Sequence, residues 1–395
     1  MSMKRITGFD APFLSVEDRQ NIQTQLEPFF AFLPMTLKKM LLNCLEVHAA
    51  STLSNNPSTH ACSVVVPAAA GALSVAEPPI TASATATPVA TTFATAPSVI
   101  GVKKHKCSAD TRQPDAPCDP LKPAVQQNWR LSITIEGARI VSMAFGVELR
   151  DAFLFCMANG VWPLRFIRNA GSLTLTEQEF LLRSRVAIIG CGALGGYVAL
   201  LLARIGVGSL VLCDDDIFEE TNLNRQLFCN EASLGRPKVA VAEEQLLSTA
   251  SHLLLTTFNE RATRKSLPYI LTGAHALVDC VDSVGARIVM DEAAVNLGIP
   301  YIHGALVGVE GFAGVSFATE GLGLVRSLYG CDTTMNDDAH VIAEMGLFPS
   351  TPSCIASLQA LFTVQTLLAA LSGETPQNRL VHLDMGVPSL ENLLF

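Results

Sequence analysis

The chain has 395 residues, of which 49% are apolar and only 16% are charged, and its formal net charge is −9. This composition allows a large apolar core, and the acidic balance disfavours a nucleic-acid partner, which usually requires an excess of Lys and Arg. We find neither an uninterrupted apolar run of membrane-spanning length nor a signal-peptide pattern. The eleven cysteines form no CxxC pair, which argues against a disulfide framework. We therefore expect a soluble, cytoplasmic protein without a membrane partner.

The first 125 residues differ in composition from the rest of the chain. Residues 49–100 contain 14 Ala, 8 Thr, 6 Pro and one charged residue, Glu77, so we expect a low-complexity linker over 49–125. We expect the N-terminal region to be largely disordered and residues 1–125 to be dispensable for catalysis. Residues 1–48 allow one short amphipathic helix without assigned chemistry, through Leu37, Met40, Leu41, Cys44 and Leu45. A small leader segment at 126–180 then precedes the main domain at 181–395.

The predicted elements begin near residue 129. Residues 131–145 have the pattern of two short strands, and 148–158 and 176–184 that of helices, the second opened by a capping box from Thr176 to Glu179. From residue 185, expected strands lie at 185–190, 209–214, 252–259, 275–282, within 301–318 and at 379–385. One expected helix follows the strand at 185–190 and ends near residue 205. Further helices are expected at 238–250, 285–297 and 353–371.

This alternation predicts an α/β fold, a Rossmann-like and mostly parallel sheet with helices on both faces, followed by an antiparallel C-terminal extension. Polar residues such as Gln359 and Thr363 interrupt the long apolar helix at 353–371. We therefore expect that helix in the core or in a subunit interface rather than in a membrane.

A glycine-rich loop follows the strand at 185–190. Gly190, Gly192 and Gly195 allow a tight turn there and let backbone N–H groups approach a phosphate at the start of the next helix. Asp214 ends the second strand, where a carboxylate can accept hydrogen bonds from a ribose. A purely structural turn and a helix-capping acid are the alternatives.

The residues after Asp214 favour a triphosphate over a nicotinamide dinucleotide. Asn222, Arg225 and Lys238 bring an amide and two cations close to the glycine loop in sequence. Such groups can neutralise charge that develops on a leaving pyrophosphate. The alternative, a solvated basic face, is less suited to a chain with so few charges.

The chain resembles the ThiF/MoeB/HesA family, bacterial relatives of ubiquitin-activating enzymes, over roughly residues 160–395. The pattern DxDxxxxxNLNRQ at 214–226, with Lys238 thirteen residues after Arg225, carries this resemblance. A second acidic motif from Asp279 to Asp282, followed by Arg287, also resembles the family, as do the sequences at 300–305, 310–311 and 357–361.

The resemblance implies roles for individual residues. Gly190, Gly192 and Gly195 would bind ATP together with Asp214 and Asp216, and Asn222, Arg225 and Lys238 would contact its phosphates. Asp282 would ligate Mg²⁺, which prefers oxygen ligands, although it could instead cap the next helix. The implied reaction is adenylation, in which the C-terminal carboxylate of a small ubiquitin-like protein ending in Gly-Gly attacks the α-phosphorus of ATP. A homodimer is also implied.

The resemblance adds two further candidate catalytic residues. Arg168 would reach the γ-phosphate of ATP in the partner subunit, unless it pairs on the surface or caps a helix. Cys331, in a loop before the helix at 353–371, would accept the acyl group or form a persulfide link. It would be an inert thiol if the neighbouring Asp332 raises its pKa. Only Cys331 and Cys354 follow residue 318, so the structural zinc of many relatives is expected to be absent.

Several other candidates are expected to be structural. His303 lies in an apolar strand and is interpreted as a core residue. Cys191, Cys213 and Cys280 lie in or beside buried strands and are interpreted as small apolar side chains.

The expected function is activation of a ubiquitin-like sulfur-carrier protein for thiamine, molybdopterin or related sulfur transfer. Three alternatives stay open: adenylation resembling that of tRNA threonylcarbamoyladenosine dehydratases, a catalytically inactive nucleotide-binding scaffold, and an NAD(P)-dependent oxidoreductase. The acidic balance argues against the first alternative, and the presence of Arg225, Lys238 and Asp282 argues against the second.

Overall fold

The computed structural model describes residues 45–49, 129–317, 323–330, 346–375 and 378–393, together with residues 20 and 24. Most of the expected linker at 49–125 and the candidate Cys331 therefore lie outside the described residues. Of the helix expected within residues 1–48, only Leu45 is described, and it begins a strand.

A small sheet precedes the main domain. It consists of β1 (Leu45–Ala49), β2 (Trp129–Ile133) and β3 (Val161–Pro163), in the order β1-β2-β3. Strand β1 runs antiparallel to β2, whereas β2 and β3 are parallel and are connected through α3 (Ile135–Phe145) and α4 (Leu149–Ala158).

The second of the two strands expected within 131–145 is wrong, because that segment is helix α3. The side chain of Thr134 accepts a hydrogen bond from the backbone N–H of Gly137 at 3.2 Å, and Gly146 ends the helix in a left-handed conformation with φ 64°. Thr134 thus caps the start of the helix and Gly146 its end. The buried residues of α3, which include Ile140 and Val141, cover one side of the helix, so its apolar residues are spaced for a helix rather than a strand.

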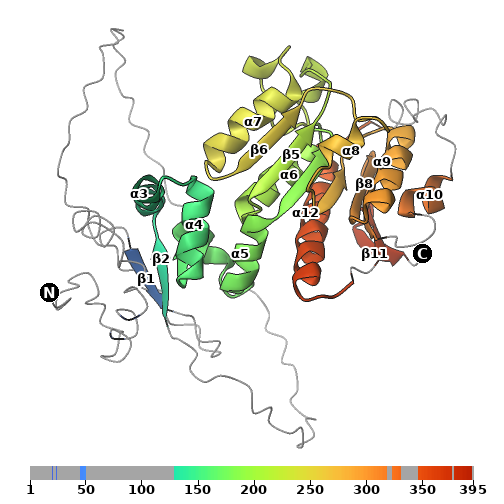
Figure 1. The fold of residues 1–395 in the computed structure, drawn as a ribbon. Coiled ribbons are helices and arrows are strands. Elements are labelled where there is room, and N and C mark those ends of the chain that lie inside the picture. The colour runs from blue at the N-terminus through green and yellow to red at the C-terminus, as the bar shows by residue number, and fades with distance from the viewer. Residues whose placement is uncertain are drawn as a thin grey trace, which may run out of the picture. The chain divides into compact units, whose positions relative to one another are not determined.

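The main sheet has eight strands in the order β11-β10-β9-β8-β7-β4-β5-β6 (Figure 1). Strands β4 to β8 form the parallel part, and the pairs β8–β9, β9–β10 and β10–β11 are antiparallel, which confirms the expected fold class. The strands are β4 (Arg185–Ile189), β5 (Ser209–Cys213), β6 (Leu254–Phe258), β7 (Ala276–Asp279), β8 (Tyr301–Val307), β9 (Glu310–Ser316), β10 (Arg379–Asp384) and β11 (Ser389–Leu393).

Helices cover both faces of this sheet because the parallel strands are apolar on both sides. Val186 and Ile188 of β4 face one apolar cluster, and Ala187 and Ile189 face the other. The first cluster includes residues of α6 (Gly195–Ile205), α7 (Lys238–Thr249) and α12 (Ser350–Leu371). The second includes residues of α8 (Leu267–Ile270), α9 (Val284–Leu297) and α10 (Leu324–Tyr329).

Helix α12 is the one described helix that is long and apolar enough to cross a membrane by length and composition alone. It packs against β8, β9 and α6, and Ile355 and Phe362 belong to the apolar core. The expectation that this helix is a core element is therefore confirmed.

Helix α5 (Leu175–Arg183) joins the small sheet to β4, and its capping box lies two residues before the expected position. The side chain of Thr174 accepts the backbone N–H of Glu177 at 3.2 Å, and the Glu177 carboxylate accepts the backbone N–H of Thr174 at 2.6 Å. This start leaves Glu179 free to bind Arg183 one turn later, at 2.7 Å. The expected pair Thr176 and Glu179 is therefore not the cap.

The connections determine where a ligand can bind. From β4 the chain proceeds to β5 and β6 on one side and then crosses to β7 on the other side. In open α/β sheets, ligands bind at the carboxyl ends of the strands where the order reverses, which here lies between β4 and β7.

Candidate functional site

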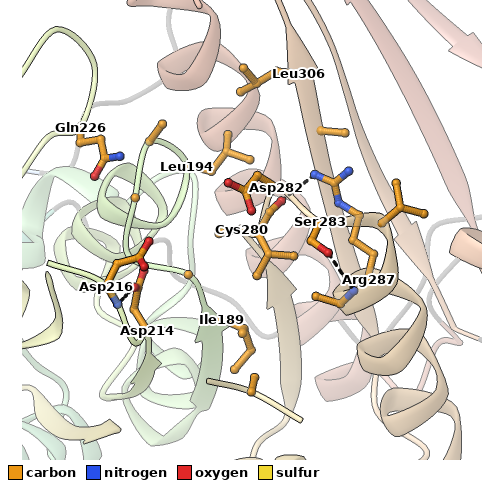
Figure 2. A pocket seen from close by; sticks show the side chains of 18 of the residues that line it. Ile189, Leu194, Asp214, Asp216, Gln226, Cys280, Asp282, Ser283, Arg287 and Leu306 are labelled. Carbon is orange, nitrogen blue, oxygen red and sulfur yellow. Dashed lines mark hydrogen bonds between the residues drawn. The ribbon is translucent and has the colours of Figure 1, made fainter. Parts of the chain in front are cut away.

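A cavity of about 520 Å³ lies at this reversal point. The residues expected from the sequence that line it are Gly190, Gly192, Asp214, Asp216, Arg225, Lys238 and Asp282. They follow three different strands, so the carboxyl ends of β4, β5 and β7 bring together segments far apart in the sequence (Figure 2). Gly195, Asn222 and Arg168 are not among the lining residues.

The glycine loop turns sharply between β4 and α6. Gly190 has φ 95°, and a Cβ atom there would lie 2.4 Å from the carbonyl oxygen of Cys280. A Cβ on Gly195 would lie 1.8 Å from the carbonyl oxygen of Gly190. Gly192, by contrast, has no atom closer than 3.5 Å to such a Cβ, so it leaves open space at the cavity wall. This geometry lets a phosphate approach the backbone at the start of α6.

Asp214 is held rigidly at the end of β5. One carboxylate oxygen accepts the backbone N–H of Cys191 at 2.6 Å, and the other accepts that of Asp216 at 2.9 Å. Burial raises the pKa of Asp214, although these hydrogen bonds and the charge of Lys238 oppose the shift. The residue thus connects the phosphate loop to the end of β5, from which it faces the cavity.

Lys238 provides a buried positive charge at the first position of α7. Its Nζ lies 2.8 Å from a carboxylate oxygen of Asp216, and its backbone N–H donates to the carbonyl oxygen of Asp216. The Lys238 side chain is only 9% exposed, whereas that of Asp216 is 67% exposed. Because solvent already reaches Asp216, an incoming phosphate can replace this carboxylate as the partner of Lys238.

Arg225 and Asn222 have different positions in the segment after β5. Arg225 lines the cavity, and its Nη1 donates to the carbonyl oxygen of Thr221 at 2.8 Å and to the Asn224 side chain at 2.9 Å. Asn222 is buried, and its side-chain oxygen accepts the backbone N–H of Glu219 at 3.0 Å. Asn222 thus shapes the turn that carries Arg225, and its contact with a phosphate stays a prediction.

Asp282 is exposed to the cavity and follows β7. The neighbouring Ser283 is the N-cap of α9 and accepts the backbone N–H of Ala286, so Asp282 is not the helix cap. No described residue hydrogen-bonds to its carboxylate. The carboxylates of Asp214, Asp215 and Asp216 also have oxygens within 4.8 Å of one another. Because Mg²⁺ prefers oxygen ligands beside phosphates, these side chains fit such an ion.

A buried polar network lies beneath Asp282, and the sequence patterns predict no function for it. The fully buried Asp279 accepts hydrogen bonds from the hydroxyl of Tyr301 at 2.7 Å and from Nδ1 of His303 at 2.8 Å. Nε of Arg287 lies 3.3 Å from the same carboxylate oxygen. His303 is therefore a buried core residue, as expected, with Nδ1 bonded to Asp279, whereas its buried Nε2 has no hydrogen-bond partner among the described residues. The signal available in the sequence was three polar side chains within two apolar strands, with an arginine on the helix between those strands.

The charges in this network balance one another. Burial raises the pKa of Asp279, but Arg287 and the hydrogen bond from His303 outweigh it, so that pKa lies below its usual value. Burial likewise opposes the charged form of Arg287, but Asp279 holds its pKa above the usual value. Burial lowers the pKa of His303 despite Asp279. The network is thus an Asp–Arg ion pair with a neutral His.

The three cysteines near the cavity are buried, as expected. Burial raises the pKa of Cys213 to about 12 and holds those of Cys191 and Cys280 well above their usual value. The thiolate is the reactive form of cysteine, so these thiols are inert at neutral pH.

Arg168 has an exposed side chain on η1 (Leu164–Asn169), away from the cavity wall. Its neighbour Arg165 donates to the carbonyl oxygen of Thr249 at 2.9 Å and so connects this segment to the end of α7. The roles expected for Arg168, in a partner subunit, and for Cys331, outside the described residues, stay predictions.

The fold is that of an α/β protein whose cavity has a glycine-rich loop, an acid at the end of β5 and four cations among its described lining residues. A model of the ThiF family matches residues 165–393. This match covers more than half of the chain, and the chain therefore belongs to the ThiF family, a family of adenylating enzymes.

Two curated relatives show the extent of the similarity. The Molybdopterin-synthase adenylyltransferase of Salmonella typhimurium is 30% identical over 207 residues, which cover 52% of this chain and 81% of the relative. The Sulfur carrier protein ThiS adenylyltransferase of Escherichia coli is 37% identical over 139 residues, which cover 35% of this chain and 55% of the relative. The chain thus spans only about half the length of the second relative.

A solved structure has a similar fold. The Microcin C7 biosynthetic enzyme MccB, in complex with N-formylated MccA, has a TM-score of 0.50 and 20% identity, and the match covers 65% of this chain and 78% of that one. At this identity the likeness concerns the fold alone.

Proposed function

We propose that this protein uses ATP and Mg²⁺ to adenylate the C-terminal carboxylate of a small ubiquitin-like sulfur-carrier protein ending in Gly-Gly. The observation that carries the proposal is that the glycine loop, Asp214, Arg225, Lys238 and Asp282 all line one cavity. The names of the two adenylyltransferase relatives support the sulfur-carrier class of substrate. A homodimer, with Arg168 acting across subunits, and a cytoplasmic location belong to the same proposal.

The proposed reaction needs little proton transfer. A carboxylate oxygen of the carrier forms a bond to the α-phosphorus while the bond to pyrophosphate breaks and its electron pair leaves with the pyrophosphate. The carboxylate is already ionised at neutral pH, so positioning and charge neutralisation provide most of the catalysis. Lys238 and Arg225 neutralise the phosphate charge, and Mg²⁺, which Asp282 would hold, would add to this neutralisation.

ATP–pyrophosphate exchange in the presence of candidate carrier proteins tests this function. Lys238→Ala and Asp282→Ala should each lower the exchange rate by about 10²-fold, the effect of removing one preorganised charge-stabilising group. Arg236→Ala is a matched control, because Arg236 also pairs with a carboxylate, that of Glu244, but does not line the cavity. Exchange that is unchanged in both cavity variants would contradict these roles.

A further inference from the structure

Two positive charges in the cavity, those of Arg261 and Arg287, have no part in the proposed contacts with ATP. Four cations line it among the described residues: Arg225, Lys238, Arg261 and Arg287. The first three follow β5 or β6, whereas Arg287 comes from α9 on the other side of the reversal point. Figure 2 shows Asp214 and Asp216 on one side of the cavity and Asp282 and Arg287 on the other.

The guanidinium of Arg287 is fixed in position. Its Nη2 donates to the carbonyl oxygens of Val281 at 2.6 Å and Gly304 at 3.2 Å, and its Nε faces Asp279. Asp279 is itself held by Tyr301 and His303. No described residue accepts a hydrogen bond from Nη1. A preorganised cation with one open donor group at a cavity wall is suited to binding an anion.

The surroundings of Arg287 favour a ligand that carries its negative charge at the end of an otherwise uncharged peptide tail. The cavity wall beyond Arg287 consists largely of apolar or small residues from β8, β9 and the segment before α12: Ala305, Leu306, Val307, Gly311, Phe312 and Leu347. Glu310 is the one acid of this wall among the described residues, and it lies 3.1 Å from Nε2 of His382. A neutral peptide tail can lie along such a surface while its terminal carboxylate reaches Arg287.

We propose that Arg287 binds the substrate carboxylate and later the acyl oxygen of the adenylate, with Asp279 as its positioning residue. This inference rests on the proposed adenylation. The carboxylate must approach the anionic phosphates and Asp282, and the guanidinium offsets this repulsion and orients the attacking oxygen. The carboxylate forms its bond to phosphorus without losing a proton, so Arg287 acts as a charged hydrogen-bond donor throughout.

Calorimetric titration with two probes tests this role. AMP occupies the nucleotide side alone, whereas 5′-O-[N-(N-acetylglycyl)sulfamoyl]adenosine adds a stable mimic of the glycyl-adenylate. Arg287→Gln should weaken binding of the acyl probe by about 10- to 100-fold, the effect of losing one charge-assisted hydrogen bond, and should change AMP affinity less than twofold.

A second variant guards against misfolding, because Arg287→Gln leaves Asp279 buried without its counter-ion. Arg287→Lys keeps the charge, but one ammonium group cannot serve Asp279, two carbonyl oxygens and the substrate together. It should fold, bind AMP normally and still lose at least tenfold affinity for the acyl probe. Arg264→Gln is the matched control. Arg264 pairs with Glu292, which lies on α9 like Arg287, and neither residue of this pair lines the cavity. This variant should bind both probes normally.

Each outcome bears on one proposal. Unchanged affinity for the acyl probe in both variants, or an equal loss for both probes, would overturn the role of Arg287. An acyl probe that binds wild-type protein no more tightly than AMP would overturn it as well. Wild-type pyrophosphate exchange identifies which proposal has failed. Exchange without these effects removes only the Arg287 role, whereas absence of both exchange and AMP binding removes adenylation itself.

Discussion

At the scale of single residues, Asp291 is a buried acid outside the cavity. It lies on α9 and is 1% exposed. A Cβ on Gly323 would lie 2.0 Å from its carboxylate, which shows how closely the start of α10 packs against it. Burial raises the pKa of Asp291 to about 6, although the backbone N–H and guanidinium of Arg326 oppose the shift, and the charges of Asp279 and Glu292 add to it. This acid is therefore destabilising when ionised.

The sign of the effect follows from the two pKa values. The usual value of 3.8 applies to the unfolded chain and about 6 to the folded one, so the folded protein holds this proton more tightly. The contribution of Asp291 to stability is then largest below pH 4 and is lost as the pH rises through about 6. A shift of this size corresponds to about 3 kcal/mol.

We expect Asp291→Asn to stabilise the protein at neutral pH. The free energy of unfolding should rise by up to about 3 kcal/mol at pH 7.5 and change little near pH 4, because the substitution removes only the charged form. Urea denaturation at both pH values measures this difference. Asp151→Asn, at a partly exposed acid paired with Arg150, is the control. A gain that is equal at both pH values would contradict the titration of Asp291.

At the scale of elements, the start of α5 shows how tertiary packing selects between two equivalent signals. Thr174 and Glu177 have the same spacing as Thr176 and Glu179, so the sequence contains two possible capping boxes. The earlier start lets Gln178, Leu181 and Leu182 face the interior. The side chain of Gln178 then donates to the carbonyl oxygen of Ile205 at 2.8 Å and connects α5 to the end of α6.

Thr174→Ala should therefore lower the free energy of unfolding by about 1 kcal/mol, the usual cost of removing an N-cap side chain. Thr176→Ala is the matched control, since Thr176 is exposed within the first turn and caps nothing. Thermal denaturation of both variants distinguishes the two caps. A larger loss in Thr176→Ala than in Thr174→Ala would show that the helix starts at the later position.

At the scale of the whole molecule, β1 changes the expectation for the N-terminal region. All five residues of β1 pair with β2, from Leu45 opposite Ile133 to Ala49 opposite Trp129. Residues 1–125 are therefore not all outside the folded unit. Removing β1 would leave one edge of β2 without its backbone partner, and exposed strand edges promote aggregation.

Two deletions separate β1 from the segment that follows it. Ala49 and Trp129 are paired, so their Cα atoms lie roughly 5 Å apart and a short turn can join them. Replacing residues 50–128 with a four-residue Gly-Ser-Asn-Gly turn should leave the melting temperature and pyrophosphate exchange unchanged. Deleting residues 1–125 should lower the melting temperature by several degrees. Equal melting temperatures for the two variants would show that β1 contributes no stability.

The parallel α/β core and several polar residues of the cavity lining could be predicted from the sequence alone. Buried parallel strands are written as short apolar runs, and a phosphate loop needs glycines whose backbone must turn and approach a ligand. Gly190, Asp214, Lys238 and Asp282 could be placed because each lies shortly after a strand or begins a helix. Patterns of this kind are local, so the sequence carries them without reference to the rest of the chain.

Which distant side chains act together depends on the tertiary structure. Asp279, Arg287 and His303 lie on three different elements, and nothing in their spacing predicts one shared buried charge network. The cap of α5 and the pairing of β1 with β2 likewise depended on packing partners elsewhere in the chain. The physical reason is that burial and charge compensation are set by neighbours in space, which a local sequence pattern does not contain.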